Sequence, residues 1–297
     1  MAARGQRVPT AGSRLAGRLF GSTRLQSAVL SVLSHLILIV ATIIVVYPVL
    51  WMFLGSLKSG TELLTNVWGL PSTPMWENYP KAWEQGRLGV AFLNSVIVSV
   101  NVVLLAVVIS SLAGFAFARM QFRGSMGLFL VFVFTMQVGA PMVPLYVLVV
   151  RMGLTDSHLG LILPQVAGAL PLAIFIFRAF FQSLPQELLD AARVDGCTDL
   201  GVFTRVVMPV SGPAVATVAI LQFLGSWNEF TLPLILVRQP DMRTLPLTLS
   251  SFTWEFGRTD WSLVFCALSV GALPMIILYV FMQRWFIQGL TEGAVKG

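Results

Sequence analysis

Six long apolar runs constrain the fold of this chain more than any other feature of its sequence. They cover residues 29–54, 90–117, 126–150, 159–177, 215–237 and 263–283. The first run contains 26 residues without an acidic residue, a lysine or an arginine. A helix needs about 20 apolar residues to cross a bilayer, whereas the apolar region of a cleaved signal peptide has about 7–15. We therefore predict an all-α integral membrane protein with six transmembrane helices, the first of them uncleaved.

The composition supports this assignment. Hydrophobic residues make up 56% of the chain and charged residues only 11%, and the mean hydropathy is +0.82. A soluble domain carries about 25% charged residues, so the composition is that of a membrane protein. The net charge is +6, but five arginines lie in the first 24 residues, beside the first apolar run. Membrane topology accounts for these arginines, and we expect no nucleic-acid partner.

The basic residues also predict an orientation. If the N-terminus is cytoplasmic, the inside segments hold twelve of the nineteen lysines and arginines, and the outside segments hold seven. Because cytoplasmic segments carry an excess of basic residues, we predict that both termini are cytoplasmic. The same orientation places the segment between the fourth and fifth runs, residues 183–213, in the cytoplasm.

Residues 183–213 form a polar segment between apolar runs and are expected to fold into two short helices. Ser183 and Gln186 have the spacing of a capping box, and good helix formers follow over residues 187–194. Gly196 should end this first helix, because glycine accepts the left-handed conformation without a Cβ clash. Thr198 can cap a second helix, and Pro209 is expected to end it before the fifth run.

This segment resembles the EAA loop of bacterial ABC importer permeases. That pattern reads Glu-Ala-Ala, three residues, Gly, nine residues, Ile, any residue, Leu-Pro. The positions that match it in spacing are Asp190, Ala191, Ala192, Gly196, Val206, Met208 and Pro209. Asp190, Val206 and Met208 are conservative replacements of Glu, Ile and Leu, and Glu187, one turn earlier, is an alternative to Asp190.

The resemblance implies that the first helix lies in a groove of a cytoplasmic ATPase. Leu188, Ala191 and Ala192 would contact apolar surface of that ATPase, and Glu187 or Asp190 would face its basic groups. The predicted ATPase-coupling residues are Glu187, Leu188, Asp190, Ala191, Ala192, Asp195, Gly196 and Pro209.

Further segments are similar to carbohydrate-importer permeases, specifically the smaller permease subunit of maltose-type systems. They are NSVIVSV, RMGLTDSHLGLILP, GSWNEFTLPLIL and QRWFIQGLTEGAVKG. The resemblance implies a subunit in the bacterial cell membrane that imports a sugar or sugar derivative. Its expected partners are a second six-helix permease, two ABC ATPase subunits that bind ATP and magnesium, an extracytoplasmic solute-binding protein, and membrane lipid. No cofactor is expected in this chain.

The expected domain organisation follows from the runs and from the resemblance. Residues 1–28 form a basic cytoplasmic tail, which we expect to be flexible. Residues 29–286 form the six-helix permease domain with its coupling loop at residues 183–213. Residues 287–297 form a second cytoplasmic tail, which in this family extends toward the ATPases.

A few polar residues lie inside the apolar runs and are candidates for the transport pathway or for helix packing. Glu229 is the one acidic residue within the six runs, and Asn228 precedes it. Because an intramembrane carboxylate usually faces a protein interior or a cavity, both roles stay open for Glu229. For Asn94 we favour an interhelical hydrogen bond. Gln137 in the third run is a further candidate.

Motifs for catalysis are absent from the sequence. It contains no GxxxxGK[ST] phosphate loop, no HExxH and no GxSxG. Cys197 and Cys266 are too few and too far apart to predict a metal site or a disulfide framework. An enzyme is therefore disfavoured. A permease for a non-sugar solute, or an ion-coupled secondary transporter with Glu229 as its ion site, remain the alternatives.

Overall fold

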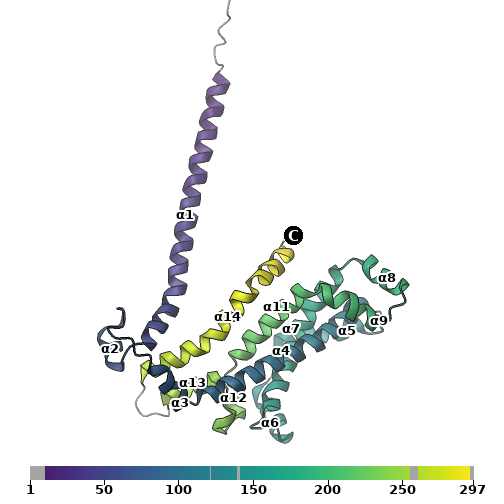
Figure 1. Ribbon diagram of the computed structural model, residues 1–297. Coiled ribbons are helices and arrows are strands. Elements are labelled where there is room, and N and C mark those ends of the chain that lie inside the picture. The colour runs from purple at the N-terminus through teal and green to yellow at the C-terminus, as the bar shows by residue number, and fades with distance from the viewer. Residues whose placement is uncertain (1–10, 121, 139–140, 255–259, 295–297) are drawn as a thin grey trace, which may run out of the picture. The chain divides into compact units, whose positions relative to one another are not determined.

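The computed structural model describes residues 11–120, 122–138, 141–254 and 260–294, and these residues form helices and loops without a β-strand (Figure 1). The chain divides into two units, residues 1–54 and 55–297, and each is described by itself. The first unit consists of α1 (Ala11–Ser56), which continues two residues into the second unit. Residues 11–28, expected to be flexible, are helical, and residues 1–10 lie outside the described part.

The second unit contains the remaining helices. The elements up to the polar segment are α2 (Gly60–Thr65), α3 (Asn78–Gln85), α4 (Leu88–Arg119), α5 (Ser125–Val138), α6 (Met142–Arg151) and α7 (His158–Ser183). The polar segment holds α8 (Gln186–Val194), α9 (Asp199–Val202), the π-helical turn η1 (Phe203–Val207) and α10 (Met208–Val210). The chain then forms α11 (Gly212–Trp227), α12 (Thr231–Leu236), the 3₁₀ turn η2 (Pro240–Met242), α13 (Leu245–Trp254) and α14 (Trp261–Ala294).

Four helices in the described residues are long and apolar enough to cross a membrane alone: Val29–Ser56, Leu88–Arg119, His158–Ser183 and Trp261–Phe281. Two bent helix pairs bring the number to six if each pair is one span. These pairs are Ser125–Gln137 with Met142–Arg151, bent by 109°, and Asp199–Val210 with Gly212–Trp227, bent by 78°. The chain is thus a multi-pass helical protein, but two of the six predicted spans are not continuous helices.

The third and fifth runs were wrongly predicted as single helices. In the third run, Pro141 stands in an extended conformation directly before α6. Proline has no N–H to donate within a helix, which accounts for the position of Pro141 at a helix boundary. In the fifth run, α11 ends at Trp227 and α12 begins only at Thr231. The bent pair that contains α11 therefore does not include α12. It joins α11 to the helical segment Asp199–Val210, which precedes it, and the bend lies at Ser211.

The core of the second unit is built on close packing between α4 and α7. A Cβ atom on Gly114 of α4 would lie 2.6 Å from the Cβ of Phe177 in α7. The absent side chain therefore lets the two backbones approach, as small residues do between membrane helices. Next to this contact, Phe115, Phe177 and Phe181 are buried in a cluster that also contains Ala214 and Val218 of α11.

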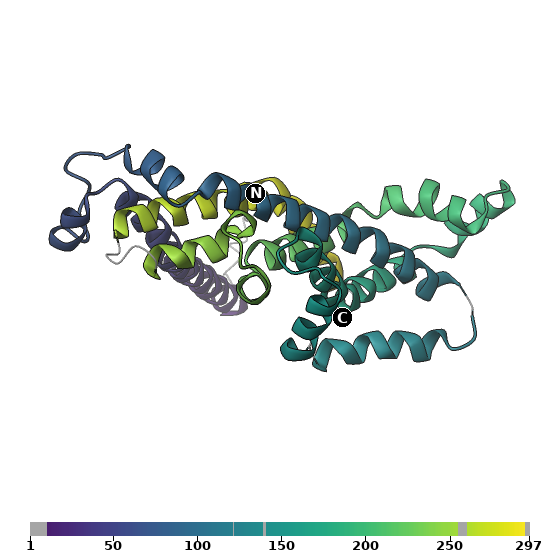
Figure 2. The same ribbon diagram turned by 90° about the horizontal axis from the view of Figure 1, so that it is seen from below.

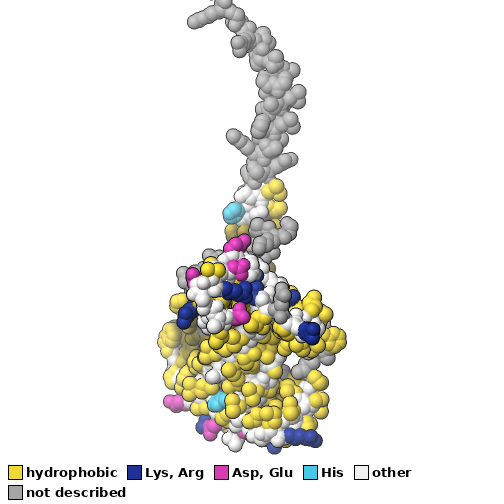
Figure 3. Space-filling view, turned by 90° about the vertical axis from the view of Figure 1, so that its right-hand side faces the viewer, with side chains coloured by type: hydrophobic (Ala, Val, Ile, Leu, Met, Phe, Trp, Pro, Cys, Tyr) yellow, Lys and Arg dark blue, Asp and Glu magenta, His cyan; other side chains and the backbone are white. Residues whose placement is uncertain are grey.

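Figure 2 shows α8 and α9 projecting past the end of the α4–α7 pair, with α5 on the other side of that end. In the space-filling view, charged side chains gather over this projecting part, while hydrophobic side chains cover the middle of the unit (Figure 3). The polar segment therefore lies beyond the apolar part of the second unit, as expected for a loop outside a membrane.

Candidate functional site

The projecting part is a helical hairpin, and its first helix matches the prediction. The helix α8 spans Gln186–Val194, one residue longer than the predicted 187–194. Gly196 has φ +84°, its N–H donates to the carbonyl of Arg193 at 3.0 Å, and the N–H of Cys197 donates to Ala192 at 3.0 Å. The prediction that glycine ends α8 in the left-handed conformation is confirmed.

The predicted capping box at the start of α8 is wrong. Ser183 is the last residue of α7, and its Oγ donates to the carbonyl of Phe180 at 2.8 Å. Pro185 is the N-cap of α8 and provides no capping side chain. The Gln186 side chain is engaged elsewhere, because its Oε1 accepts from Arg119 at 2.7 Å. The contact between Gln186 and Arg119 of α4 thus takes the place of the predicted local contact between Gln186 and Ser183.

The second half of the hairpin begins as predicted but ends differently. The Oγ1 of Thr198 accepts from the N–H of Gly201 at 3.3 Å, so Thr198 caps α9. Pro209 does not end this helix, because helical structure continues through η1 and α10 to Val210. Proline has no N–H to donate to the preceding turn. Directly before Pro209, the N–H of Met208 donates to the carbonyl of Phe203, five residues earlier, in the wider turn of a π-helix. The chain bends instead at Ser211, whose Oγ donates to the carbonyl of Val207 at 2.6 Å.

Apolar packing holds the hairpin against the helix bundle. Leu189 is 0% exposed and Ala192 is 7% exposed in the cluster that contains Phe177 and Phe181 of α7. The prediction that Ala192 lies on the outer face is therefore wrong: residues 189 and 192, three positions apart, share the inner face of α8. Of the predicted coupling residues around α8, Glu187, Leu188, Asp190, Ala191 and Asp195 are exposed.

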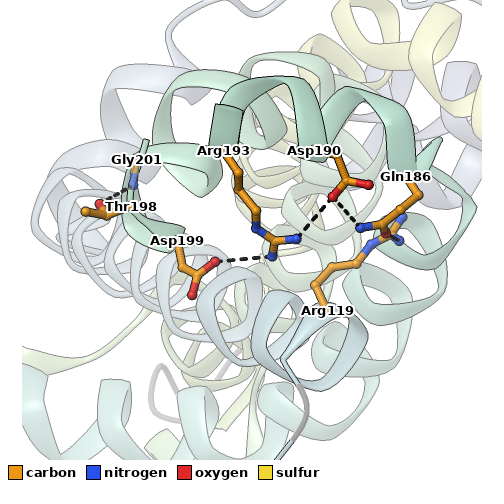
Figure 4. A network of polar contacts seen from close by, with 7 residues as sticks. All are labelled: Arg119, Gln186, Asp190, Arg193, Thr198, Asp199 and Gly201. Carbon is orange, nitrogen blue, oxygen red and sulfur yellow. Dashed lines mark hydrogen bonds and ion pairs between the residues drawn. The ribbon is translucent and has the colours of Figure 1, made fainter. Parts of the chain in front are cut away.

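A polar network ties the start of α8 to the ends of α4 and α7. Figure 4 shows its residues on α4, α8 and α9. Arg119, the last residue of α4, donates to the carbonyl of Phe181 through Nε at 3.0 Å and through Nη2 at 2.6 Å. Its Nη2 also donates to the carbonyl of Leu184, and its Nη1 to Gln186. Arg119 thus adds donors at the C-terminal end of α7, where the Phe181 carbonyl also accepts the N–H of Leu184 at 3.4 Å. The sequence prediction used this arginine only to orient the chain.

The acidic residue of the loop pattern, Asp190, belongs to the same network. Its Oδ1 accepts from Nε2 of Gln186 at 3.0 Å and pairs with Nη1 of Arg193 at 3.4 Å. The Nη2 of Arg193 reaches Oδ1 of Asp199 at 3.2 Å and so joins α8 to α9. These side chains are 39–56% exposed, and ion pairs of this kind contribute at most about 1 kcal/mol each. The network orients the hairpin more than it stabilises it.

The Asn94 side chain joins three parts of the second unit. Asn94 is buried, and its Nδ2 donates to the carbonyls of Asp241 at 2.8 Å and Arg243 at 3.1 Å. Its Oδ1 lies 2.9 Å from Nε2 of His158, so Nε2 carries the proton in this contact. Asn94 therefore makes an interhelical hydrogen bond between α4 and α7 and holds the segment around η2.

Glu229 lies outside a helix, in the break between α11 and α12. Its Oε1 accepts from the N–H groups of Thr231 at 2.8 Å and Leu232 at 3.0 Å, which are unpaired at the start of α12. The prediction that Glu229 lies within a continuous transmembrane helix is therefore wrong. Asn228 is exposed and donates to the carbonyl of Leu224 at 2.9 Å, and Gln137 is exposed at the end of α5.

Comparisons with known proteins show the family that the loop pattern indicated. Residues 106–292 match the family described as binding-protein-dependent transport system inner membrane component. The probable ABC transporter permease protein YurM of Bacillus subtilis is 38% identical over 260 residues, which cover 86% of this chain and 85% of the relative. The arabinooligosaccharides transport system permease protein AraQ of the same organism is 36% identical over 278 residues, 92% of this chain and 98% of the relative.

Two further similarities concern a more distant relative and the fold. The diacetylchitobiose uptake system permease protein NgcG of Streptomyces coelicolor is 34% identical over 267 residues, 89% of this chain and 88% of the relative. A chain in the crystal structure of a bacterial ABC transporter involved in the import of the acidic polysaccharide alginate has the same fold, with a TM-score of 0.77 and 22% identity. The match covers 95% of this chain and 100% of that chain. The chain described here belongs to the family of binding-protein-dependent transport system inner membrane components, the permease subunits of ABC importers.

Proposed function

We propose that this chain is a transmembrane permease subunit that imports an oligosaccharide through the bacterial plasma membrane. The observation that carries the proposal is the extended similarity to permeases named for arabinooligosaccharides, diacetylchitobiose and melibiose, raffinose and stachyose. Each of these matches covers at least four fifths of this chain. By this proposal a second permease completes the pathway, and an extracytoplasmic binding protein delivers the sugar.

The α8–α9 hairpin is proposed to couple the permease to two cytoplasmic ATPase subunits, which bind ATP and magnesium. The exposed residues Glu187, Leu188, Asp190 and Ala191 would contact the ATPase. Both termini and the loop at residues 183–213 are then cytoplasmic. The geometry supports this proposal because one face of α8 is buried in the bundle and the opposite face is exposed.

Transmission of movement from the hairpin requires a rigid connection, and two features supply one. Leu189 and Ala192 pack in the same cluster as Phe181 of α7 and Val218 of α11. The Arg119 guanidinium connects α8 to the end of α4. Because packed interiors transmit displacement with little compression, a shift of α8 would move the ends of α4, α7 and α11 together.

The ion-coupled alternative is disfavoured by the position of Glu229. Its carboxylate caps α12 through two backbone N–H groups, and it lies outside a continuous span. A structural role for Glu229 is therefore sufficient, and no ion needs to be invoked.

Co-purification in mild detergent tests the proposal. Gly196 and Gly153 form a matched pair: both have positive φ, and each N–H donates at 3.0 Å to the carbonyl three residues earlier. Proline cannot adopt either conformation. The wild-type chain and the Gly153→Pro variant should retain an ATPase and a second permease, while Gly196→Pro should lose the ATPase. Loss of the ATPase from both variants, or from neither, would refute a specific role for the hairpin.

A further inference from the structure

An open cavity of about 850 Å³ lies where the end of α4, the start of α5 and the start of α8 meet. Its lining residues are Phe117, Ala118, Arg119, Met120, Phe122, Arg123, Ser125, Gln186 and Arg193. Three of these nine residues are arginines and none is acidic. The lining of the cavity therefore carries positive charge, which favours a negatively charged ligand.

The positive charge of this wall is only partly neutralised. Arg119 donates to the carbonyls of Phe181 and Leu184 and to the amide of Gln186, which are all neutral groups. Arg193 is paired with Asp190 and Asp199. Arg123 is exposed and contributes a further charge. A ligand with a phosphate group would complement this arrangement, because guanidinium groups bind phosphate with charge-assisted hydrogen bonds.

The cavity also lies at the level where two apolar helices end. Arg119 is the last residue of a 32-residue span, and Ser125 is the first residue of α5. On the apolar side, the Phe117 ring contacts Phe122 and Phe129, with centroids 5.9 Å and 5.8 Å away. In a membrane, such a boundary is where lipid headgroups meet acyl chains.

One face of α5 continues the apolar side away from the cavity. Met126, Leu130 and Phe134 follow each other at intervals of four residues and are 59%, 53% and 68% exposed. Residues at this spacing form a stripe along one side of a helix. The stripe starts one residue after Ser125, so a headgroup in the cavity would have an apolar surface for its chains.

We propose that this cavity binds the phosphate headgroup of an anionic phospholipid, whose acyl chains lie along α5. Basic pockets between membrane helices on the cytoplasmic side recognise such headgroups. A bound lipid would contact residues of α4, α5 and α8 together and would add to the connection between the hairpin and the bundle. The lipid site rests on the proposed membrane orientation, but its binding can be measured without transport.

Native mass spectrometry of the full chain, released from mild detergent, tests the proposal. The protein is equilibrated with phosphatidylglycerol or with phosphatidylcholine, and retained lipids are counted for wild type, Arg123→Gln and Arg151→Gln. Arg151 is the matched control, because it is also exposed at a helix end but lies outside the cavity lining. Arg123→Gln should weaken phosphatidylglycerol retention about fivefold, as expected for one basic charge near a headgroup. Arg151→Gln should retain as much phosphatidylglycerol as wild type. Retention of phosphatidylcholine should be the same in all three proteins.

Two outcomes would overturn the proposal. The first is equal phosphatidylglycerol retention by wild type, Arg123→Gln and the charge-reversing variant Arg123→Glu. The second is Arg123-dependent binding of glycerol 3-phosphate with no preference for phosphatidylglycerol, which would identify a site for a free phosphate compound. Co-purification of the ATPase is scored in the same preparations, so failure of the lipid site is distinguished from failure of the proposed transport function.

Discussion

The guanidinium of Arg119 makes two hydrogen bonds to the carbonyl oxygen of Phe181, from Nε at 3.0 Å and from Nη2 at 2.6 Å. This contact joins the last residue of α4 to the last turn of α7. The same guanidinium reaches Gln186 in the first turn of α8. One side chain thus fixes the ends of two long helices and the start of the hairpin.

Replacing Arg119 by lysine tests whether its role depends on its positive charge or on the planar geometry of its hydrogen-bond donors. Arg119→Lys keeps the positive charge but loses the planar arrangement of donors that serves three acceptors. We expect Arg119→Lys to lower transport per ATP hydrolysed in the reconstituted complex and to destabilise the chain by about 1.5–3 kcal/mol. Arg151→Lys, which ends α6 and makes none of these contacts, is the control. Normal coupling in Arg119→Lys would show that the contact between Arg119 and Gln186 does not connect the hairpin to the bundle.

Leu188 and Leu189 are neighbours on opposite sides of α8 and should behave in opposite ways. Leu189 is 0% exposed, so Leu189→Ala should destabilise the chain by about 2–5 kcal/mol, measured by thermal unfolding in detergent. Leu188 is 39% exposed, so Leu188→Ala should leave unfolding unchanged but weaken the association with the ATPase. Equal effects of the two substitutions on both measurements would contradict the assignment of an inner and an outer face.

Gly114 should tolerate no side chain. A Cβ at this position would lie 2.6 Å from the Cβ of Phe177, a distance that requires α4 and α7 to separate. Gly114→Ala is expected to cost about 1–3 kcal/mol in unfolding free energy. Gly168→Ala in α7 is the control, because nothing lies within 4 Å of its built Cβ. A stability of Gly114→Ala at or above that of Gly168→Ala would argue against this close helix contact.

Asp156 predicts a dependence of stability on pH. Its carboxylate accepts hydrogen bonds from the backbone N–H groups of Gln239 and Arg238, which lower its pKa below the ordinary value of 3.8. Because the folded pKa is depressed, the contribution of Asp156 is complete above the ordinary pKa and is lost as the pH falls through the folded value. Asp156→Asn should therefore be less stable than wild type at pH 7, and the difference should shrink below about pH 4. A difference that is constant from pH 7 to pH 3 would contradict this cause.

Substitutions of Glu229 distinguish between two roles, capping of α12 and binding of a coupling ion. Glu229→Gln keeps an oxygen that can accept from Thr231 and Leu232, so transport should persist, with a modest loss of stability. Glu229→Ala removes the cap and should cost about 1 kcal/mol, as loss of a helix cap usually does. Transport that is abolished by Glu229→Gln, and that proceeds without the ATPase, would favour an ion-coupled transporter.

Local patterns in the sequence predicted the parts of the fold that depend on local chemistry. Four of the six apolar runs located helices that can cross a membrane alone, and Gly196 marked the end of α8, because both depend on properties of neighbouring residues. The matched spacing of Asp190, Ala191, Ala192 and Gly196 indicated the importer permease family, and these four residues lie on the hairpin that projects from the bundle.

The remaining features depend on contacts between distant residues. Arg119 and Phe181 are 62 positions apart, and no local pattern indicates that the arginine caps α7 instead of facing water. The inner face of α8 is set by the aromatic cluster on α7, which is why Ala192 was assigned to the wrong side. Pro209 was expected to stop a helix, but the π-helical turn before it lets the helix continue.

Photo-crosslinking from the outer face of α8 tests the central claim most directly. Leu188→p-benzoylphenylalanine, in membranes that contain the complete transporter, should form a crosslink to the ATPase. Met152, 56% exposed directly after α6, is the matched control and should form none. A crosslink to the ATPase from position 188 but not from position 152 is the predicted result. No crosslink from position 188, or one of equal yield from position 152, would contradict the assignment of the hairpin as the coupling site.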